Sequence, residues 1–106
     1  MQSDSFEQII EKLSDLLGLT LYEARAYATL LLDNKPTTRY DLAKKAHIPS
    51  AKIYETIQKL YEKELVLQTA DEVPLVVALD SDQLLDRLRS QQENSLSRLS
   101  NLLTEA

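Results

Sequence analysis

The chain has 106 residues, with 17 acidic and 12 basic side chains, a net charge of −5 at pH 7, one glycine and no cysteine. This length suits one domain that folds without disulfides or a metal, and the lack of cysteine excludes thiolate zinc sites and thiol nucleophiles. A single histidine, His47, excludes a catalytic triad or a multi-histidine metal site, and a single glycine disfavours phosphate-cradling loops. We therefore expect neither enzymatic activity nor a cofactor.

The distribution of apolar and charged residues indicates where the protein works. No apolar run is long enough to span a membrane, and the polar start MQSDSFEQ is unlike a secretory signal. The many carboxylates lie mostly on the polar sides of predicted helices, which indicates solvated charge rather than catalytic pairs. We expect a cytoplasmic protein.

The first predicted helix is amphipathic. Ser5 or Ser3 can cap its start, and Gly18 ends it. Its apolar stripe has helical spacing and consists of Phe6, Ile9, Ile10, Leu13, Leu16 and Leu17. The stripe needs a partner, which is either the core, the C-terminal helix or a second subunit.

The second predicted helix has clear start and stop signals. Thr20 caps it, and Glu23 three residues later completes a capping box. Asn34-Lys35-Pro36 ends it. The side predicted to be buried consists of Ala24, Tyr27, Ala28, Leu30 and Leu31.

Residues 37–62 are typical of a helix-turn-helix, in which two short helices meet at a tight corner. Thr37 or Thr38 caps the first helix, and Pro49 is expected at the first position of the second, about residues 49–63. On the second helix Ile53, Ile57 and Leu60 share one face. The side chains predicted to point away from it are Ala51, Lys52, Glu55, Gln58, Lys59 and Glu62, with Tyr54 and Tyr61 on one shoulder.

The corner between these helices is expected at Ala46-His47-Ile48. His47 stands where such motifs commonly carry glycine. We expect it to tolerate a strained corner conformation or to hydrogen-bond locally, with a phosphate contact as the alternative.

Basic residues concentrate in this motif. The overall charge argues against nucleic acid, because phosphate neutralisation supplies most non-specific affinity. However, residues 37–63 contain six basic and three acidic side chains, a net charge of +3, whereas the rest of the chain carries −8. The basic island therefore coincides with the helix-turn-helix.

Two short β-rich runs follow, Leu65–Thr69 and Pro74–Leu79, around the segment 70–73. This pattern predicts a hairpin. Three helices and a hairpin make a winged helix, so the fold class that we expect is mainly α with a small β-hairpin. A winged helix-turn-helix would be preceded by an N-terminal helix and followed by a long C-terminal one.

Asp80 or Ser81 caps this last helix, predicted from about Asp82 to Leu103, which spans roughly 33 Å. Its seam follows an eleven-residue repeat better than heptads, and the predicted dimerisation residues are Leu85, Leu88, Gln92, Leu96, Leu99 and Leu103. We expect a homodimer through this helix, parallel or antiparallel, with packing on the chain's own first helix as the alternative. Residues 1–80 would form the DNA-binding domain and 81–106 the dimerisation element.

The hypothesis from these residues is that the second helix of the motif, about residues 49–63, is a recognition helix that enters the major groove of duplex DNA. Ser50 and Lys52 would lie near backbone or base edges, Gln58 could read adenine, and Glu55 could accept from cytosine. Phosphate contacts would come from Arg39, Lys44, Lys45 and Lys59. The full set of candidate DNA-binding residues is Arg39, Lys44, Lys45, Ser50, Ala51, Lys52, Tyr54, Glu55, Gln58 and Lys59.

The segment LGLTLYEARAY, residues 17–27, resembles the opening of the TrmB-type transcriptional regulators of archaea and bacteria. The likeness continues through DLAKKAHIPSAKIYETIQKLYEKELV, where the family carries I-A-x-x-x-G-V-P-x-x-K-V-Y-E-x-L-x-x-L-x-x-K-G-L-V, and covers roughly Leu17 to Asp80. The resemblance implies a winged-helix DNA-binding domain that is commonly dimeric. Longer members often join it to a sugar-binding regulatory domain, which is absent here. The recognition-helix Lys and Tyr of the family fall on Lys52 and Tyr54.

The chain departs from this pattern in three places. Ser50 stands where many members have arginine, Glu64 replaces a glycine, and Leu75-Val76-Val77 occupy a wing strand that is often basic or aromatic. Asp71 and Glu72 lie at the predicted wing tip, so the wing should repel phosphate rather than clamp it.

Two further readings of the sequence stay open. The same fold could be a protein-protein interaction module with little or no DNA binding, which would bind through its apolar first helix, its leucine-rich last helix and an uncharged wing. The acidic balance and the missing wing arginines favour this reading. The chain could also be one piece of a longer regulator, since its last helix reaches Thr104-Glu105-Ala106 without a glycine cap or proline stop. An effector site would then lie elsewhere.

Overall fold

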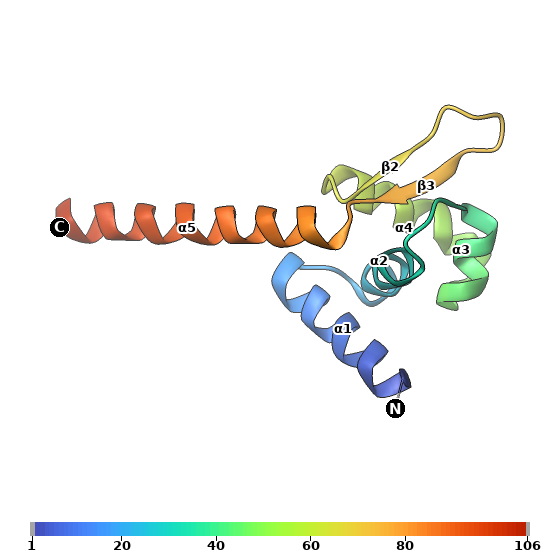
Figure 1. Cartoon of the computed structure of the whole chain (residues 1–106), viewed down its shortest axis with the longest axis horizontal. Coiled ribbons are helices and arrows are strands. Elements are labelled where there is room, and N and C mark those ends of the chain that lie inside the picture. The colour runs from blue at the N-terminus through green and yellow to red at the C-terminus, as the bar shows by residue number, and fades with distance from the viewer. Residues whose placement is uncertain (1, 106) are drawn as a thin grey trace.

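The computed structural model describes residues 2–105, with side chains from residue 5 onwards. In chain order its elements are α1 (Gln2–Leu17), α2 (Leu21–Asp33), β1 (Thr37–Thr38), α3 (Arg39–Ala46), α4 (Ser50–Glu62), β2 (Val66–Gln68), β3 (Leu75–Ala78) and α5 (Ser81–Glu105). Helices α1 to α4 and the small sheet form a rounded body, from which α5 projects as a rod (Figure 1). The winged helix-turn-helix predicted from the sequence is confirmed.

Helix α2 lies at the centre of the rounded body and contacts α1, α3, α4 and β3. Its ends match the predicted signals. The Thr20 side chain accepts from the Glu23 N–H, the Glu23 carboxylate accepts from the Thr20 N–H, and Asn34 ends the helix in the left-handed conformation. Small residues let the other helices approach closely, because Ala24, Ala26 and Ala28 are all completely buried.

The stripe on α1 packs mainly on this core, with Ile10 and Leu13 buried and Phe6, Ile9 and Leu17 partly buried. Of the three partners considered for the stripe, the core is therefore the one that the structure provides. Leu16 is the exception, since 63% of its surface is exposed. The prediction that Ser3 or Ser5 caps α1 is wrong, because the helix begins at Gln2 and both serines lie inside it.

The corner between α3 and α4 is close to the prediction. Thr38 caps α3 by accepting from the Asp41 N–H, and His47 ends it with φ 55° and ψ 48°. The expected strained corner conformation of His47 is thus confirmed. Pro49, predicted at the first helical position, instead precedes the helix as its N-cap residue with an extended ψ of 139°. Its fixed φ suits both positions, which explains the shift of one residue.

The wing consists of β2 and β3, paired antiparallel with Leu67 opposite Val77. The hairpin is confirmed, with strands shorter than predicted. A third strand, β1, was not predicted. It pairs with β3, so that Thr37 lies opposite Val76, and the sheet order is β1-β3-β2. Strand β3 therefore ties the wing to the residues that begin α3.

Tyr27 lies fully buried in the core, and its hydroxyl has no hydrogen-bond partner in the part of the chain that the structure describes. Burial raises the pKa of this phenol to about 12. The side chain therefore contributes as a neutral, space-filling aromatic group.

Helix α5 begins with a cap at Asp80, whose carboxylate accepts from the Gln83 N–H at 2.8 Å. Leu84 packs into the core, and every residue from Arg89 to Glu105 is exposed. The alternative that α5 folds back on α1 of the same chain is therefore wrong.

We predict that replacing His47 by glycine stabilises the fold. His47 (φ 55°) and Glu64 (φ 61°) hold left-handed backbone conformations at positions where the family pattern has glycine. Relief of this strain exceeds the extra unfolded-state entropy of glycine, so His47→Gly and Glu64→Gly should each add about 0.5–1 kcal/mol to the free energy of unfolding. Thermal unfolding at one fixed protein concentration measures this effect.

The matched control is His47→Ala, which removes the imidazole but keeps Cβ and hence the strain. It should not raise the unfolding temperature. Equal stabilisation by alanine and glycine would show that the imidazole, rather than the backbone conformation, is unfavourable at this corner.

Candidate nucleic-acid interface

Helix α4 presents a polar face to solvent. Ile53, Ile57 and Leu60 are buried, and the predicted outward residues are all exposed: Ala51, Lys52, Glu55, Gln58, Lys59 and Glu62. Tyr54 and Tyr61 lie on one shoulder with 63% and 48% of their surfaces exposed. The predicted division of this helix into a packed and a free face is therefore confirmed.

The N-terminal end of α4 is open to a partner. Pro49 supplies no side-chain hydrogen bond to the helix, and no acidic residue lies in the first turn. The first main-chain N–H groups of a helix have no partner within the helix and carry the positive end of its dipole. This end of α4, with Ser50 and Ala51 exposed, suits contact with an anion.

Three of the six cations in the basic island form ion pairs within the chain. Lys45 lies 3.1 Å from Asp33, Lys59 lies 3.7 Å from Glu62, and Lys63 lies 2.7 Å from Glu23. Arg39, Lys44 and Lys52 have no carboxylate within 4.0 Å among the described residues. The charge free to meet a phosphate is therefore smaller than the sequence indicates.

The candidate DNA-binding residues differ in their local contacts. The Arg39 guanidinium lies over the Tyr54 ring, 5.0 Å from its centroid, on the side of α4 that meets α3. On the opposite side, a shallow depression of about 340 Å³ next to the start of α2 is lined by Lys52, Glu55 and Lys59 together with Thr20, Tyr22, Glu23 and Thr56. Lys45 points toward Asp33 of α2.

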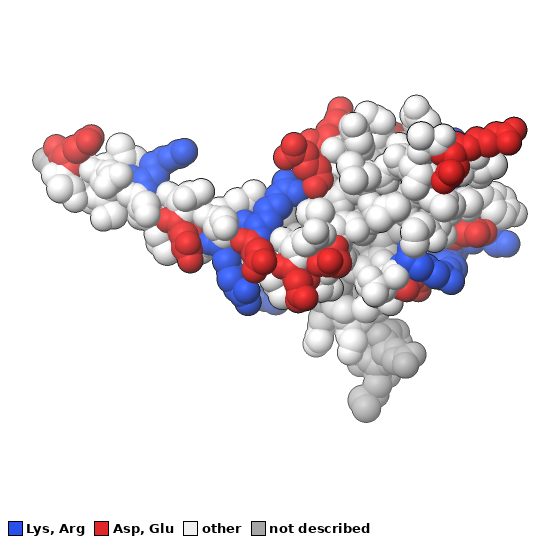
Figure 2. All heavy atoms as spheres, turned by 45° about the horizontal axis from the view of Figure 1, so that its top comes forward, with Lys and Arg blue, Asp and Glu red and all other residues white. Residues whose placement is uncertain are grey.

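Lysine and arginine side chains are scattered over the face drawn in Figure 2, between acidic and uncharged ones, and form no continuous patch there. The exposed Asp71 and Glu72 stand in the wing loop, as predicted. The Asp71 carboxylate accepts from the Thr69 hydroxyl at 2.7 Å, which orders that loop.

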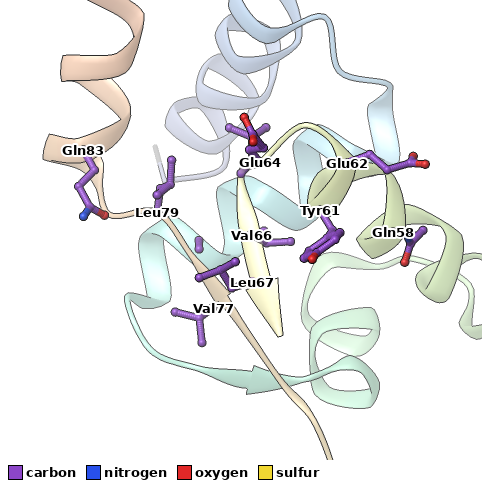
Figure 3. Close-up of a pocket in the computed structure, with 11 residues that line it drawn as sticks. Gln58, Tyr61, Glu62, Glu64, Val66, Leu67, Val77, Leu79 and Gln83 are labelled. Atoms are coloured by element: carbon purple, nitrogen blue, oxygen red, sulfur yellow. The ribbon is translucent and has the colours of Figure 1, made fainter. Parts of the chain in front are cut away.

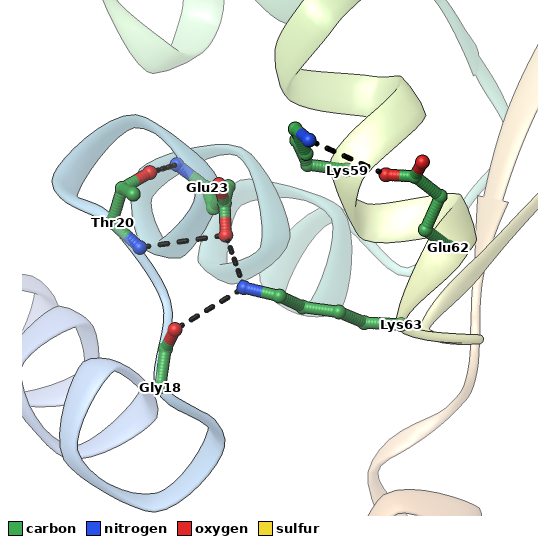
Figure 4. Close-up of polar contacts among 6 residues, drawn as sticks. All are labelled: Gly18, Thr20, Glu23, Lys59, Glu62 and Lys63. Carbon is green, nitrogen blue, oxygen red and sulfur yellow. Dashed lines mark hydrogen bonds and ion pairs between the residues drawn. The ribbon is translucent and has the colours of Figure 1, made fainter.

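The end of α4 is fixed by contacts that sequence reasoning missed. The Lys63 ammonium group reaches back to the start of α2, where it donates to the Glu23 carboxylate and, at 3.1 Å, to the Gly18 carbonyl (Figure 4). Arg87 of α5 donates to the carbonyls of Lys63 and Glu64 at 2.8 and 2.7 Å. The corner is held as well, because Arg25 of α2 donates to the His47 carbonyl at 3.0 Å.

These contacts give a structural role to the segment that carries the family resemblance. Thr20, Glu23 and Arg25 all lie in LGLTLYEARAY. Glu23 and Arg25 hold α2 against the end of α4 and against the corner before it, and Thr20 caps α2 and bonds to Glu23. The only signal for them in the sequence was the capping box, which indicates a helix start and not a tertiary contact.

Burial and hydrogen bonding act in opposite directions on Glu23. Burial alone would raise the pKa of Glu23, because only 8% of its side chain is exposed. Hydrogen bonds from Lys63 and Thr20 outweigh burial and hold the pKa of Glu23 below its ordinary value of 4.5. The ionised carboxylate therefore stabilises the folded state.

An apolar groove of about 650 Å³ lies between the end of α4, the wing and the start of α5. Tyr61 and Gln58 border it on one side and Leu79 and Gln83 on the other, with Leu67 and Val77 between them (Figure 3). Glu62 and Glu64 stand at its rim. The groove offers apolar contact and negative charge, which suits a protein segment better than a phosphate backbone.

The predicted dimerisation residues lie on the projecting helix. Leu85, Leu96, Leu99 and Leu103 each expose at least 46% of their surface, and Leu88 is partly buried at the junction with the domain. The leucines of this helix are therefore left without a packing partner in the described part of the single chain, apart from Leu84 and Leu88.

The sequence matches a family of transcriptional regulators. The family described as "Sugar-specific transcriptional regulator TrmB" matches residues 13–82. Protein YrhO of Bacillus subtilis, described as uncharacterized, is 34% identical over 77 residues, which are 73% of this chain and 28% of that protein. The sugar-sensing transcriptional regulator TrmBL1 of Pyrococcus furiosus is 30% identical over 99 residues, 93% of this chain and 28% of the regulator.

Among solved structures, the archaeal chromatin protein TrmBL2, described as showing a novel mode of DNA binding, superposes with a TM-score of 0.77. It is 23% identical, and the superposition covers 92% of this chain and 37% of the TrmBL2 chain. At this identity the likeness concerns the fold.

In the described range 2–105, no helix has the length and apolar character needed to cross a membrane.

We predict that the Glu23 contact makes stability depend on pH. Because the folded-state pKa is lowered, the contribution is fully present above the unfolded value near 4.5 and is lost as pH falls through the folded-state value. Wild type should exceed Glu23→Gln in unfolding free energy by about 1–3 kcal/mol at pH 7, and the difference should shrink toward pH 3. Thermal or urea unfolding across this range measures it.

Glu7→Gln, at an exposed carboxylate of α1 without an ion pair in the described structure, is the control and should show no such convergence. A difference between wild type and Glu23→Gln that stays constant from pH 7 to pH 3 would contradict the assignment.

Proposed function

The chain belongs to the TrmB family of transcriptional regulators, and we propose that it binds duplex DNA as a homodimer and regulates transcription. The residues 1–80 would form the DNA-binding domain and 81–106 the dimerisation helix. We infer a binding function rather than catalysis, because the family is one of transcriptional regulators. It would act in the cytoplasm, where the DNA of bacteria and archaea lies.

The observation that carries this proposal is the exposed face of the helix-turn-helix. It combines an α4 whose first turn has no side-chain cap with three cations, Arg39, Lys44 and Lys52, that are free of carboxylates within the described structure. A helix N-terminus and free cations together favour the phosphate backbone.

In the proposed complex, α4 enters the major groove with its N-terminal end first. Ser50 and Lys52 would contact backbone or base edges, Gln58 would read adenine, and Glu55 would accept from the cytosine amino group. Arg39 and Lys44 would lie on phosphates. Lys45 and Lys59 would have to exchange Asp33 and Glu62 for phosphate, so their contribution should be smaller.

The wing should contribute little to this complex. The wing loop carries Asp71 and Glu72, and the strand residues Leu67 and Val77, which line the groove, are apolar. Affinity would then depend on few phosphate contacts for each protomer, and two protomers are needed for useful binding. A dimer would place two recognition helices about 34 Å apart, one turn of duplex, on a palindrome-like site.

Effector recognition is proposed to lie outside the matched region. The matched region is 28% of the length of both curated relatives. Where those relatives sense a ligand, we attribute that function to their remaining part.

A protein-protein interaction module is the second candidate. The apolar groove beside the wing and its acidic rim favour it. The two functions differ in their response to salt, because a contact built on leucine and valine loses little affinity when salt rises, whereas phosphate contacts weaken steeply.

We predict salt-dependent binding to duplex DNA that depends on the helix-turn-helix cations. Fluorescence anisotropy across a salt series should give a steep negative slope of log affinity against log salt. The Lys44→Ala, Lys52→Ala double variant should lower this slope by about two units for each bound protomer, since each lost phosphate contact removes about 0.9.

The matched control removes two cations elsewhere, Lys12 of α1 and Arg98 of α5, with the oligomeric state verified. It changes net charge equally and should leave the slope almost unchanged. A folded dimer that fails to bind duplex at low salt would overturn the proposal and direct attention to the leucine faces and the groove.

We predict that α5 dimerises the chain through its leucine seam. Leu96→Glu and Leu99→Glu should each shift the dimer toward monomer in sedimentation experiments, because a charge would replace an apolar contact. Both residues are more than half exposed in the single chain, so the domain should stay folded. Asn94→Glu, on the opposite side of the helix, should leave dimerisation intact. A wild-type chain that is monomeric at concentrations where it binds DNA contradicts the dimer.

A further inference from the structure

Two cations of α3, Arg39 and Lys44, each lie over a tyrosine ring. The Arg39 guanidinium lies 5.0 Å from the centroid of the Tyr54 ring, which joins the start of α3 to the middle of α4. The Lys44 ammonium group lies 5.2 Å from the centroid of the Tyr40 ring, one turn earlier on α3. Neither cation has a carboxylate within 4.0 Å in the described structure.

The basic island is therefore divided by type of partner. Lys45, Lys59 and Lys63 face carboxylates, whereas Arg39 and Lys44 face aromatic rings. The difference matters for binding an anion. A carboxylate neutralises a cation and occupies its N–H donors, while a ring attracts it through the quadrupole and accepts no conventional hydrogen bond.

We propose that Tyr40 and Tyr54 are positioning residues of the DNA interface, which hold Lys44 and Arg39 in place to contact phosphates. This inference rests on the proposed function and adds Tyr40, which sequence reasoning did not select. The rings restrict two long side chains before DNA arrives, so less rotamer entropy is lost on binding. The charges stay available because their N–H donors are not taken.

The exposure of the two rings agrees with this role. Tyr40 and Tyr54 expose 69% and 63% of their surfaces, so the core does not require them. The hydroxyl is dispensable for holding a cation, because the attraction comes from the ring face. Phenylalanine should therefore replace tyrosine at both positions, and leucine should not.

The experiment compares Tyr40→Phe and Tyr40→Leu, each alone and with Lys44→Ala, in the full chain and at fixed salt. The probe is the duplex that wild type binds. Tyr40→Leu should weaken binding about two- to fivefold, and Tyr40→Phe should bind as wild type. In the Lys44→Ala background, Tyr40→Leu should have no further effect, which is the coupling expected if Tyr40 acts through Lys44.

The salt slope separates positioning from direct contact. Tyr40→Leu keeps Lys44, so the slope should stay within a few tenths of wild type, whereas Lys44→Ala should lower it by about one unit for each protomer. Tyr61→Leu is the control, since Tyr61 is exposed on the same shoulder of α4 with no cation over its ring among the described residues. Tyr54→Leu, alone and combined with Arg39→Ala, gives a second and independent double-mutant cycle if a Tyr40 variant unfolds.

Three results would overturn the inference while leaving the proposed function intact: unchanged binding by Tyr40→Leu and Tyr54→Leu, equal losses for phenylalanine and leucine, or a leucine effect that persists without the cation. Wild-type protein that shows no salt-dependent binding would overturn both. Two- to fivefold losses confined to the leucine variants and coupled to the cations would establish the positioning role.

Discussion

The contact between the start of α2 and the end of α4 is the constraint on which the geometry of the recognition helix depends. Glu23 is a nearly buried carboxylate, and its burial is tolerated only because Lys63 and the Thr20 main chain supply hydrogen bonds. Lys63 also binds the Gly18 carbonyl, so one ammonium group joins the α1-α2 corner to the last turn of α4. With Arg25 holding the corner before α4, both ends of the exposed helix are fixed by polar groups of α2.

This arrangement changes what the basic island means. Counted along the sequence, six cations between residues 37 and 63 indicate a surface for phosphate. In the structure, Lys63 stabilises the fold and Lys45 and Lys59 are close to carboxylates. A small acidic chain can thus place half of its basic residues in one motif, and yet only three cations of that motif lack an ion pair in the described structure. In the proposed complex, the few phosphate contacts would therefore have to be well positioned, and two protomers would have to act together.

Helical spacing and caps predicted most of the fold, because they are local. The capping box at Thr20, the left-handed corner at His47 and the buried face of Ile53, Ile57 and Leu60 all follow from residues a few positions apart. Strand β1 could not be predicted, since two threonines become a strand only by pairing with Val76. The hydrogen bonds of Lys63, Arg25 and Arg87 to main-chain carbonyls were missed for the same reason, because their partners lie 22 to 45 residues away along the sequence.

The direction of α5 links the two halves of the proposed function. An isolated helix is marginally stable in water, and the 17 residues from Arg89 to Glu105 are all exposed in the single chain. A leucine seam on such a segment gains most by pairing with another apolar surface. Arg87, just before this segment, donates to the carbonyls that end α4, so the path of α5 is fixed relative to the recognition helix. A second copy of the chain that pairs through this seam would therefore also set the distance between the two recognition helices, and a change at the distal end of α5 would alter that distance.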